Sequence, residues 1–294
     1  MAKTIKICID PGHTKNYNKG IVAGYYEGNM TLALAQELKK ALEEYDGAQV
    51  YMTRTTGAEN PALSTRGKMA VNNGCRLFIS LHSDASNSTS TRGVTVIRSL
   101  KRADSQALGE KLAAAIAGCM ETKLSPYGGA KNGVWTRKYP NTTNTDYYAV
   151  IRNAVTGACV KEAFLIEHSF HTNPTDCAWL DRAANRQKLA QVEAATIAEY
   201  YGLKKKETSK TGSSAAGAAG KLYRVQVGAF SKKENAQAMQ KKLKGKGYSP
   251  IITAVTKADK SLLYRVQVGA FSKKANAQRL VAELKTKGFT GIIV

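Results

Sequence analysis

The sequence IKICIDPGH, residues 5–13, decides how the first two thirds of the chain fold. Its apolar run from Ile5 to Asp10 stops at Pro11-Gly12, a pattern typical of a buried strand that ends in a turn. Four further short runs with strand character follow along the chain: Gln49–Thr53, Leu77–Leu81, Val94–Ile97 and Phe164–Glu167.

Helical patterns lie between these strands. Thr31–Tyr45 repeats apolar residues at helical spacing (Leu32, Ala35, Leu38, Leu42), and Asp46-Gly47 stops it. Ala107–Leu124 and Asn185–Tyr201 have the same character. Strands that alternate with helices predict an α/β domain, here a mixed sheet with helices on both faces.

A compositional break divides the chain. The stretch GLKKKETSKTGSSAAGAAGK, Gly202–Lys221, is rich in Gly, Ala, Ser and Lys and has no apolar periodicity, which is typical of a flexible tether. We therefore expect a first domain over residues 1–202, a linker over 203–220 and a second domain over 221–294.

The second domain contains an internal repeat. The sequence YRVQVGAFSKK occurs at Tyr223–Lys233 and again at Tyr264–Lys274, 41 residues later. Each copy reads as a strand, a helix (Asn235–Leu243 or Asn276–Leu284) and a second strand. Two copies are too few for a solenoid. They predict one small α+β domain of βαβ-βαβ order with pseudo-symmetry.

The positive charge is concentrated in this second domain. The chain has 44 Lys and Arg against 22 Asp and Glu, and residues 221–294 alone contain 16 basic and 3 acidic residues. Such asymmetry indicates a polyanionic partner, which can be nucleic acid, a membrane surface or an envelope polymer. No apolar run approaches the roughly 20 residues that span a bilayer, so we expect no membrane-spanning segment. We also expect no membrane partner.

The cysteines and the N-terminus bear on the compartment. Five cysteines are scattered without a CxxC pair, which predicts buried, reduced thiols: Cys8, Cys75, Cys119, Cys159 and Cys177. The first residues read as a strand rather than as a secretory signal. We therefore expect synthesis in the cytoplasm, and export by another factor or by cell lysis if the target lies outside.

Three residues suggest a metal site. His13 follows the first strand, His82 follows the third, and Glu27 stands near the start of the first long helix. Two histidines and a glutamate are a recurrent catalytic zinc set, and ligands gather beyond the carboxyl ends of strands in open α/β sheets. On spacing alone the signal is weak, because a histidine beside a strand is more often structural.

Six motifs in order make the sequence recognisable: IDPGH (Ile9–His13), EGNMTLALA (Glu27–Ala35), TR (Thr53-Arg54), RxxxAxN (Arg66–Asn72), ISLHSDA (Ile79–Ala85) and LIEHSFHTNP (Leu165–Pro174). Together they resemble the Amidase_3 family of N-acetylmuramoyl-L-alanine amidases over roughly residues 3–200. The resemblance implies Zn²⁺ as cofactor with His13, Glu27 and His82 as ligands, and Glu167 as the catalytic residue. A carboxylate in that role takes a proton from water and passes it to the leaving amine.

The sequence departs from that family near Glu167. His168 stands where a small residue or Thr is usual, and alternation along a continued strand would point it away from Glu167. His171 is a candidate substrate- or oxyanion-binding residue, with a solvent-facing position as the alternative. Asp84 replaces a frequent Asn, and Gly157-Ala158-Cys159 replaces a usual proline. We interpret Arg54 and Arg66 as structural or loop-fixing donors rather than substrate clamps.

The repeated segment resembles the SPOR domain, on its aromatic-x-V-Q-V-G-x-F opening and Ala-rich helix. That resemblance implies binding to peptidoglycan glycan from which stem peptides have been removed. Alternation puts Arg224 and Gln226, and in the second copy Arg265 and Gln267, on one sheet face as candidate glycan contacts. The aromatic signature of RNA-recognition domains is absent, so we expect no nucleic acid partner. The alternative is an inert sandwich with solvated charge.

The two resemblances predict one function: zinc-dependent cleavage of the bond between N-acetylmuramic acid and L-alanine by a wall-bound enzyme. The alternatives are another zinc peptidoglycan peptidase, or a non-enzymatic binder of glycan or nucleic acid. A wall hydrolase without a signal peptide is typical of phage or prophage endolysins, which rely on a holin for release. Oligomeric state has no signature in the sequence.

Overall fold

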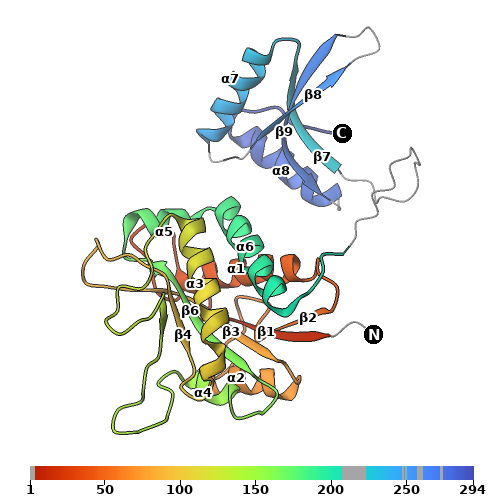
Figure 1. Cartoon of the computed structure of the whole chain (residues 1–294). Coiled ribbons are helices and arrows are strands. Elements are labelled where there is room, and N and C mark those ends of the chain that lie inside the picture. Colours follow the sequence, from red (N-terminus) through yellow and green to blue (C-terminus); the bar gives the residue numbers. More distant parts are fainter. Residues whose placement is uncertain (1–3, 207–222, 247, 249, 257–260, 272–273) are drawn as a thin grey trace. The chain divides into compact units, whose positions relative to one another are not determined.

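The computed structural model describes residues 4–206 and 223–294, apart from 247, 249, 257–260 and 272–273. The chain divides into two compact units, Met1–Lys210 and Thr211–Val294 (Figure 1). Most of the predicted linker, from residue 207 onward, lies outside the described residues. Its first residues belong to the first unit, because Lys206 N donates to Glu44 O at 2.8 Å and Asp46 N donates to Lys204 O at 2.8 Å.

The first unit is built on a six-stranded mixed sheet in the order β2-β1-β3-β6-β4-β5. The strands are β1 (Ile5–Pro11), β2 (Ala48–Met52), β3 (Leu77–Asp84), β4 (Thr95–Arg98), β5 (Val134–Trp135) and β6 (Glu162–Phe170). β1 pairs in parallel with β2 and β3, and β3 pairs in parallel with β6. β4 runs antiparallel to β6 and parallel to β5. The predicted mixed sheet is confirmed.

Helices cover both faces of this sheet, as expected. The cluster on one face includes α1 (Glu27–Leu42), α3 (Gln106–Met120) and α6 (Ala183–Tyr201), with α5 (Pro174–Asp181) packed against α6. The cluster on the other includes α2 (Leu63–Asn72) and α4 (Ala149–Ala154), which pack against each other. A short 3₁₀ turn, Ala103–Ser105, leads into α3.

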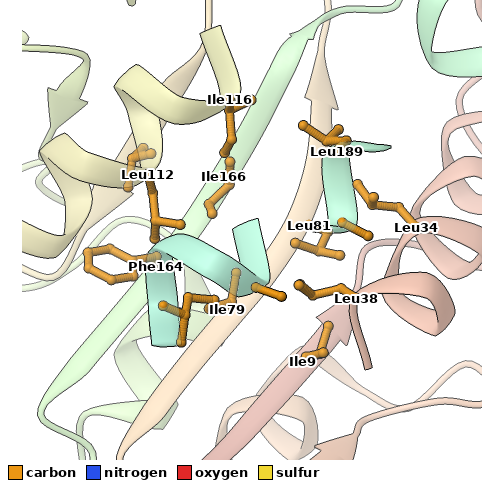
Figure 2. Close-up of a cluster of buried hydrophobic side chains, with 14 of the residues drawn as sticks. Ile9, Leu34, Leu38, Ile79, Leu81, Leu112, Ile116, Phe164, Ile166 and Leu189 are labelled. Atoms are coloured by element: carbon orange, nitrogen blue, oxygen red, sulfur yellow. The ribbon is translucent and has the colours of Figure 1, made fainter. Parts of the chain in front are cut away.

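Strand alternation divides the core between the two faces. Ile9, Ile79 and Ile166 point toward α1, α3 and α6 (Figure 2), whereas Phe78 and Leu165 belong to the α2/α4 cluster. All five side chains are buried. The strands are therefore apolar on both faces, which is why they read as continuous apolar runs rather than as alternating ones.

Several predicted boundaries are wrong. The first helix begins at Glu27 rather than Thr31 and ends at Leu42 rather than Tyr45. The helix after β4 ends at Met120 rather than Leu124, because Glu121 takes a left-handed conformation with φ 53° and caps it. β3 and β6 run on to Asp84 and Phe170, so His82 and Glu167 lie inside strands rather than beyond or at their ends.

The second unit has the predicted βαβ-βαβ order. Its elements are β7 (Tyr223–Phe230), α7 (Lys233–Lys244), β8 (Ile251–Thr256), β9 (Leu262–Phe271), α8 (Lys274–Thr286) and β10 (Ile292–Ile293). The strands form one antiparallel sheet in the order β10-β7-β9-β8, and both helices pack against β7 and β9. The fully buried residues of its core are pairs 41 positions apart: Val225 and Val266, Ala236 and Ala277, Leu243 and Leu284.

Cysteine usage agrees with the expectation of reduced thiols. All five cysteines are free, and only Cys159 is partly exposed. Among the helices of the described ranges, none is long and apolar enough to cross a membrane.

Two helical glycines test how tightly the first unit is packed. A Cβ at Gly67 in α2 would collide with Val150 O and lie 2.6 Å from Ala154 N, both backbone atoms of α4, whereas a Cβ at Gly118 in α3 would meet nothing within 4 Å. We expect Gly67→Ala to lower the free energy of unfolding by about 1–3 kcal/mol. Gly118→Ala should raise it by up to about 1 kcal/mol through helix propensity.

Chemical unfolding followed by tryptophan fluorescence measures both effects. Both tryptophans, Trp135 and Trp179, belong to the first unit, so the signal reports this unit alone. Equal effects of the two substitutions would contradict the tight α2–α4 contact.

Candidate functional site

The three candidate metal ligands come from neighbouring elements. His13 follows β1, Glu27 is the first residue of α1, and His82 lies in β3. Because β1 and β3 pair in parallel, with Pro11 opposite Leu81, both histidines reach the same edge of the sheet. One ligand atom from each of the three residues lies within 4.8 Å of the others. The structure thus brings the predicted triple together.

Glu27 stands between the two imidazoles. Its Oε2 lies 3.2 Å from His13 Nε2 and its Oε1 lies 3.0 Å from His82 Nδ1. Asn18 Nδ2 donates to Oε2 at 2.7 Å and Ser83 N donates to Oε1 at 3.0 Å. Burial alone would raise the pKa of Glu27, but its hydrogen bonds with the two histidines lower it well below its usual range. Glu27 is therefore a buried, ionised carboxylate.

This donor set fits a zinc ion. Two imidazole nitrogens and one carboxylate oxygen face each other, and catalytic zinc sites use such a set with one position left for water. The outer nitrogen of His82, Nε2, lies 3.1 Å from Ser80 Oγ, which donates to Asp10 Oδ2 at 2.6 Å. A metal-bound histidine is usually oriented by a hydrogen bond of this kind on its other nitrogen.

Two buried arginines hold the loop that carries His13. Arg54 donates to Pro11 O (3.0 Å), Gly12 O (2.9 Å) and Gly28 O (2.7 Å). Arg66 donates to Pro11 O at 3.0 Å and to His13 O at 2.9 Å. His13 has φ 60°, a left-handed conformation that is costly for a residue with a side chain. The predicted role of Arg54 and Arg66 as loop-fixing donors is thus confirmed. Their hydrogen bonds stabilise the left-handed backbone conformation of His13.

Glu167 lies directly across from His82 in the β3–β6 register. It lines a pocket of about 320 Å³ that His13, Glu27 and His82 also line. Its Oε2 is buried and has no hydrogen-bond partner among the described residues. Burial raises the pKa of Glu167, and the charges of Asp84 and Glu27 raise it further. An unpartnered carboxyl with a raised pKa can accept a proton and release it again.

The remaining walls of the pocket are partly apolar. Leu63 of α2, Val150 of α4 and Leu165 of β6 line it, together with Asp84 and Tyr148. Tyr127 Oη donates to Asp84, so this extra acid is held in place by a phenol. Gly157, Ala158 and Cys159, which replace the family's usual proline, are not among the residues that line this pocket.

The two histidines beyond Glu167 have different places. His168 points to the opposite face, as alternation predicts, where its Nε2 lies 2.8 Å from Glu193 Oε1 of α6 and its Nδ1 donates to His82 O at 2.9 Å. His171 lines the pocket, and its Nδ1 donates to Ser83 O at 2.8 Å. A solvent-facing position for His171 is wrong, since it is 5% exposed.

Sequence reasoning missed the residues that support the triple. Asn18 contacts both His13 (3.3 Å) and Glu27, yet nothing in its surroundings marks it. Asp10 and Ser80 lie inside the motifs IDPGH and ISLHSDA, so those motifs carried the signal. Tyr148 follows another tyrosine just before α4, and its place at the pocket depends on a loop that no pattern predicts.

In the described part of the second unit, both helices pack on one face of the sheet and leave the other face uncovered. The buried Val225 and Val266 face α7 and α8, so their neighbours Arg224 and Arg265 project from the other face, where both are exposed. Gln226 lies opposite Gln267 in the β7–β9 register, as two predicted glycan contacts side by side. On the two outer strands, exposed isoleucines lie next to these glutamines: Ile292 of β10 is opposite Gln226, and Ile251 of β8 is opposite Gln267.

Comparison with known proteins agrees with the motifs. Residues 7–199 match the Amidase_3 family, described as N-acetylmuramoyl-L-alanine amidase, and residues 219–294 match the SPOR domain. The chain is 28% identical over 259 residues to the sporulation-specific N-acetylmuramoyl-L-alanine amidase of Bacillus subtilis (strain 168), with 84% of each chain covered. It is 26% identical over 259 residues to N-acetylmuramoyl-L-alanine amidase CwlM of Bacillus licheniformis, again with 84% of each covered.

A solved structure shares the fold. The catalytic domain of CwlV, an N-acetylmuramoyl-L-alanine amidase from Bacillus (Paenibacillus) polymyxa var. colistinus, superposes with a TM-score of 0.56 at 23% identity. The match covers 68% of this chain and all of that domain, so it concerns the first unit.

The His168–Glu193 pair gives a test of how β6 is anchored. His168 Nδ1 faces a carbonyl oxygen and must carry a proton, and Nε2 shares a second proton with Glu193. Glu193→Ala leaves that nitrogen buried without a partner, and we expect a loss of about 3–5 kcal/mol in the free energy of unfolding. Glu193→Gln still offers an N–H to Nε2 and should cost about 1 kcal/mol.

Tryptophan fluorescence during chemical unfolding separates the two variants. If the Ala and Gln substitutions cost the same, the hydrogen bond that Gln can still make to His168 contributes nothing, and the loss of the carboxylate charge alone sets the cost.

Proposed function

The chain belongs to the Amidase_3 family of N-acetylmuramoyl-L-alanine amidases and ends in a SPOR domain, and on that premise we propose that it is a zinc enzyme that cleaves between N-acetylmuramic acid and L-alanine in peptidoglycan. The observation that carries the zinc assignment is the convergence of His13, Glu27 and His82 within one pocket, across from Glu167.

Zinc held by these residues would lower the pKa of water to about 7 and polarise the scissile carbonyl. The carboxylate of Glu27 would balance one of the two positive charges of the ion, and Asn18 and Ser83 hold that carboxylate in place. His82 keeps its orientation through Ser80 and Asp10, so two of the three ligands are fixed by partners of their own.

Glu167 is the proton carrier in this proposal. Burial and the charges of Asp84 and Glu27 raise the pKa of Glu167, which favours the protonated form that a proton carrier must pass through. It accepts the proton of the attacking water and returns it to the nitrogen of L-alanine, which then leaves as a free amine. His171, at the wall of the same pocket, is proposed to contact the substrate.

The SPOR domain is proposed to hold the enzyme on its product. Cleavage leaves a glycan strand without stem peptides, and the open sheet face offers guanidinium and amide donors to sugar hydroxyls through Arg224, Gln226, Arg265 and Gln267. The exposed Ile251 and Ile292 flank these donors with apolar surface that suits the faces of sugar rings. A tether to a wall-bound domain raises the local concentration of the catalytic unit.

Two alternatives are separable by products. A zinc peptidase of the same site would cut within the stem peptide, which mass spectrometry of digested muropeptides detects. A non-enzymatic binder would leave the wall covalently intact. The endolysin setting, with cytoplasmic synthesis and holin-dependent release, stays a prediction that the neighbouring genes would test.

The site residues can be tested by measuring zinc content and the rate of amide cleavage separately in each variant. We expect Glu27→Ala to lose zinc in elemental analysis, whereas Glu167→Gln should keep a full equivalent and lose about 10²–10⁴-fold in the rate of amide cleavage. Cleavage is measured on purified walls as new amino termini on alanine without new reducing sugar, with and without chelator.

Three results would each contradict one part of the proposed function. Full zinc in Glu27→Ala removes Glu27 from the ligand set, and full activity in Glu167→Gln removes Glu167 from the mechanism. New reducing ends from the unmodified protein would make the amidase assignment wrong.

The wall-binding face is tested in the inactive Glu167→Gln chain, which leaves the wall unchanged during the assay. The double substitution Arg224→Gln and Arg265→Gln should weaken binding to peptide-free glycan by about tenfold, since each hydrogen bond contributes about 1 kcal/mol or less. Lys241→Gln with Lys242→Gln removes the same charge from the exposed side of α7 and is the matched control. Equal weakening by both pairs would mean that only net charge matters.

A further inference from the structure

The segment after β5 forms a hairpin that leads directly into Tyr148, a residue of the pocket lining. Tyr139 N donates to Thr145 O at 2.8 Å and Tyr147 N donates to Arg137 O at 2.9 Å, so residues 137–147 fold back on themselves. The buried Asp146 anchors this 137–147 hairpin to the end of β4, because it accepts hydrogen bonds from Ser99 Oγ and Leu100 N, both at 2.7 Å. The hairpin is therefore a fixed structural element.

Arg137 is held on this hairpin by aromatic rings. Its guanidinium carbon lies 3.7 Å from the centroid of the Tyr147 ring and 5.9 Å from that of Tyr148, and its Nη1 lies 3.5 Å from Tyr148 Oη. A cation over an aromatic face is attracted by the negative charge of the ring face. The stacking orients the side chain while leaving it exposed.

The donors of Arg137 are largely unused. Within the described parts of the chain, its guanidinium forms no ion pair, and its contacts are a hydrogen bond with Tyr148 and the stacking on the two tyrosine rings. Its neighbour Arg152 differs, since Nη1 of Arg152 donates to Asp146 O at 2.6 Å and to Tyr147 O at 3.1 Å. Arg152 is thus used to hold the end of the hairpin, whereas Arg137 has N–H donors available for a ligand.

The sheet order places Arg137 on a defined side of the pocket. The histidines come from β1 and β3, Glu167 comes from the next strand β6, and β5, which leads into the hairpin, lies beyond β4. Tyr148 bridges the two regions, since it lines the pocket together with Glu167 and contacts Arg137. Arg137 is thus on the Glu167 side, away from the metal ligands.

That side must face the leaving group. The carboxyl group that returns a proton to the nitrogen of L-alanine has to lie within hydrogen-bond reach of that nitrogen. In a pose that meets this requirement, the peptide continues from this L-alanine past Glu167 toward Tyr148, which lines the same pocket. Tyr148 lies between the pocket and the guanidinium, so in this pose Arg137 meets the peptide beyond L-alanine, one extended residue of about 3.3–3.6 Å further on.

We propose that Arg137 binds the free α-carboxylate of the second stem-peptide residue, a glutamate joined to the rest of the stem through its side chain. This assignment rests on the proposed amidase function and adds a specificity to it. A guanidinium offers paired N–H donors that match a carboxylate, and its charge strengthens both bonds. A carboxamide at the same position presents one acceptor and no charge, so the enzyme prefers walls in which this carboxylate is not amidated.

The test compares two wall preparations that differ in amidation of the second stem residue. For the unmodified protein we expect initial cleavage rates at low wall concentration to be about three- to tenfold higher on the unamidated wall, the range for an exposed charge-assisted pair. Arg137→Gln should abolish that preference and keep the rate on amidated wall within twofold. Arg137→Lys, which keeps the charge without the paired donors, should retain part of it.

Lys138→Gln is the matched control, because Lys138 is an exposed cation of the same hairpin with no ion pair in the described residues. It should keep the full preference. Equal rates of the unmodified protein on both walls would overturn the proposal, and so would an equal loss on both walls in Arg137→Gln, which indicates a structural role. No cleavage of either wall by the unmodified protein is a different result, since it overturns the proposed function itself.

Discussion

A buried carboxylate, Asp10, links three segments at the edge of the sheet that carries the candidate site. It is fully buried at the end of β1 and accepts hydrogen bonds from Thr53 Oγ1, from Ser80 Oγ and from Arg66 Nη1. A buried charge is tolerated only when its partners are complete. Each partner belongs to a different segment, and one of them, Ser80, orients His82. The same cluster therefore satisfies one buried charge and positions His82, a proposed metal ligand.

The position of Glu27 depends on similar tertiary contacts, which explains why its helix is predicted to begin too late. Gly28 and Asn29 are poor helix formers, so propensity delays the start of the helix to Thr31. In the structure, Arg54 donates to Gly28 O, and Glu27 N donates to Asn18 O at 2.8 Å. These contacts add a helical turn that no local pattern contains, and that turn carries the carboxylate between the two histidines.

The parts that could be predicted are those whose patterns are local. Apolar runs buried on both faces predict the central strands, and a repeat of 41 residues predicts paired elements in the second unit. α2 escaped prediction because only Arg66, Gly67 and Ala70 of its residues are buried, which leaves no apolar stripe. The hairpin and Tyr148 could not be predicted either, because an internal acid, Asp146, fixes them through contacts with residues 47 positions away. The site was recognisable from motifs, whereas the walls that select a substrate depend on contacts between distant segments.

Two consecutive residues of β6, Glu167 and His168, point to opposite faces of the sheet, and their contacts constrain the register between β3 and β6. Glu167 faces the pocket, whereas His168 faces α6 and bonds both to Glu193 and to the carbonyl of His82. A slip of one residue would exchange them and leave Glu193 buried opposite a carboxylate. Two buried carboxylates that face each other repel strongly unless one takes up a proton, so the slipped pairing is disfavoured. The His168–Glu193 pair thus favours the observed β3–β6 register, in which Glu167 lies across from His82.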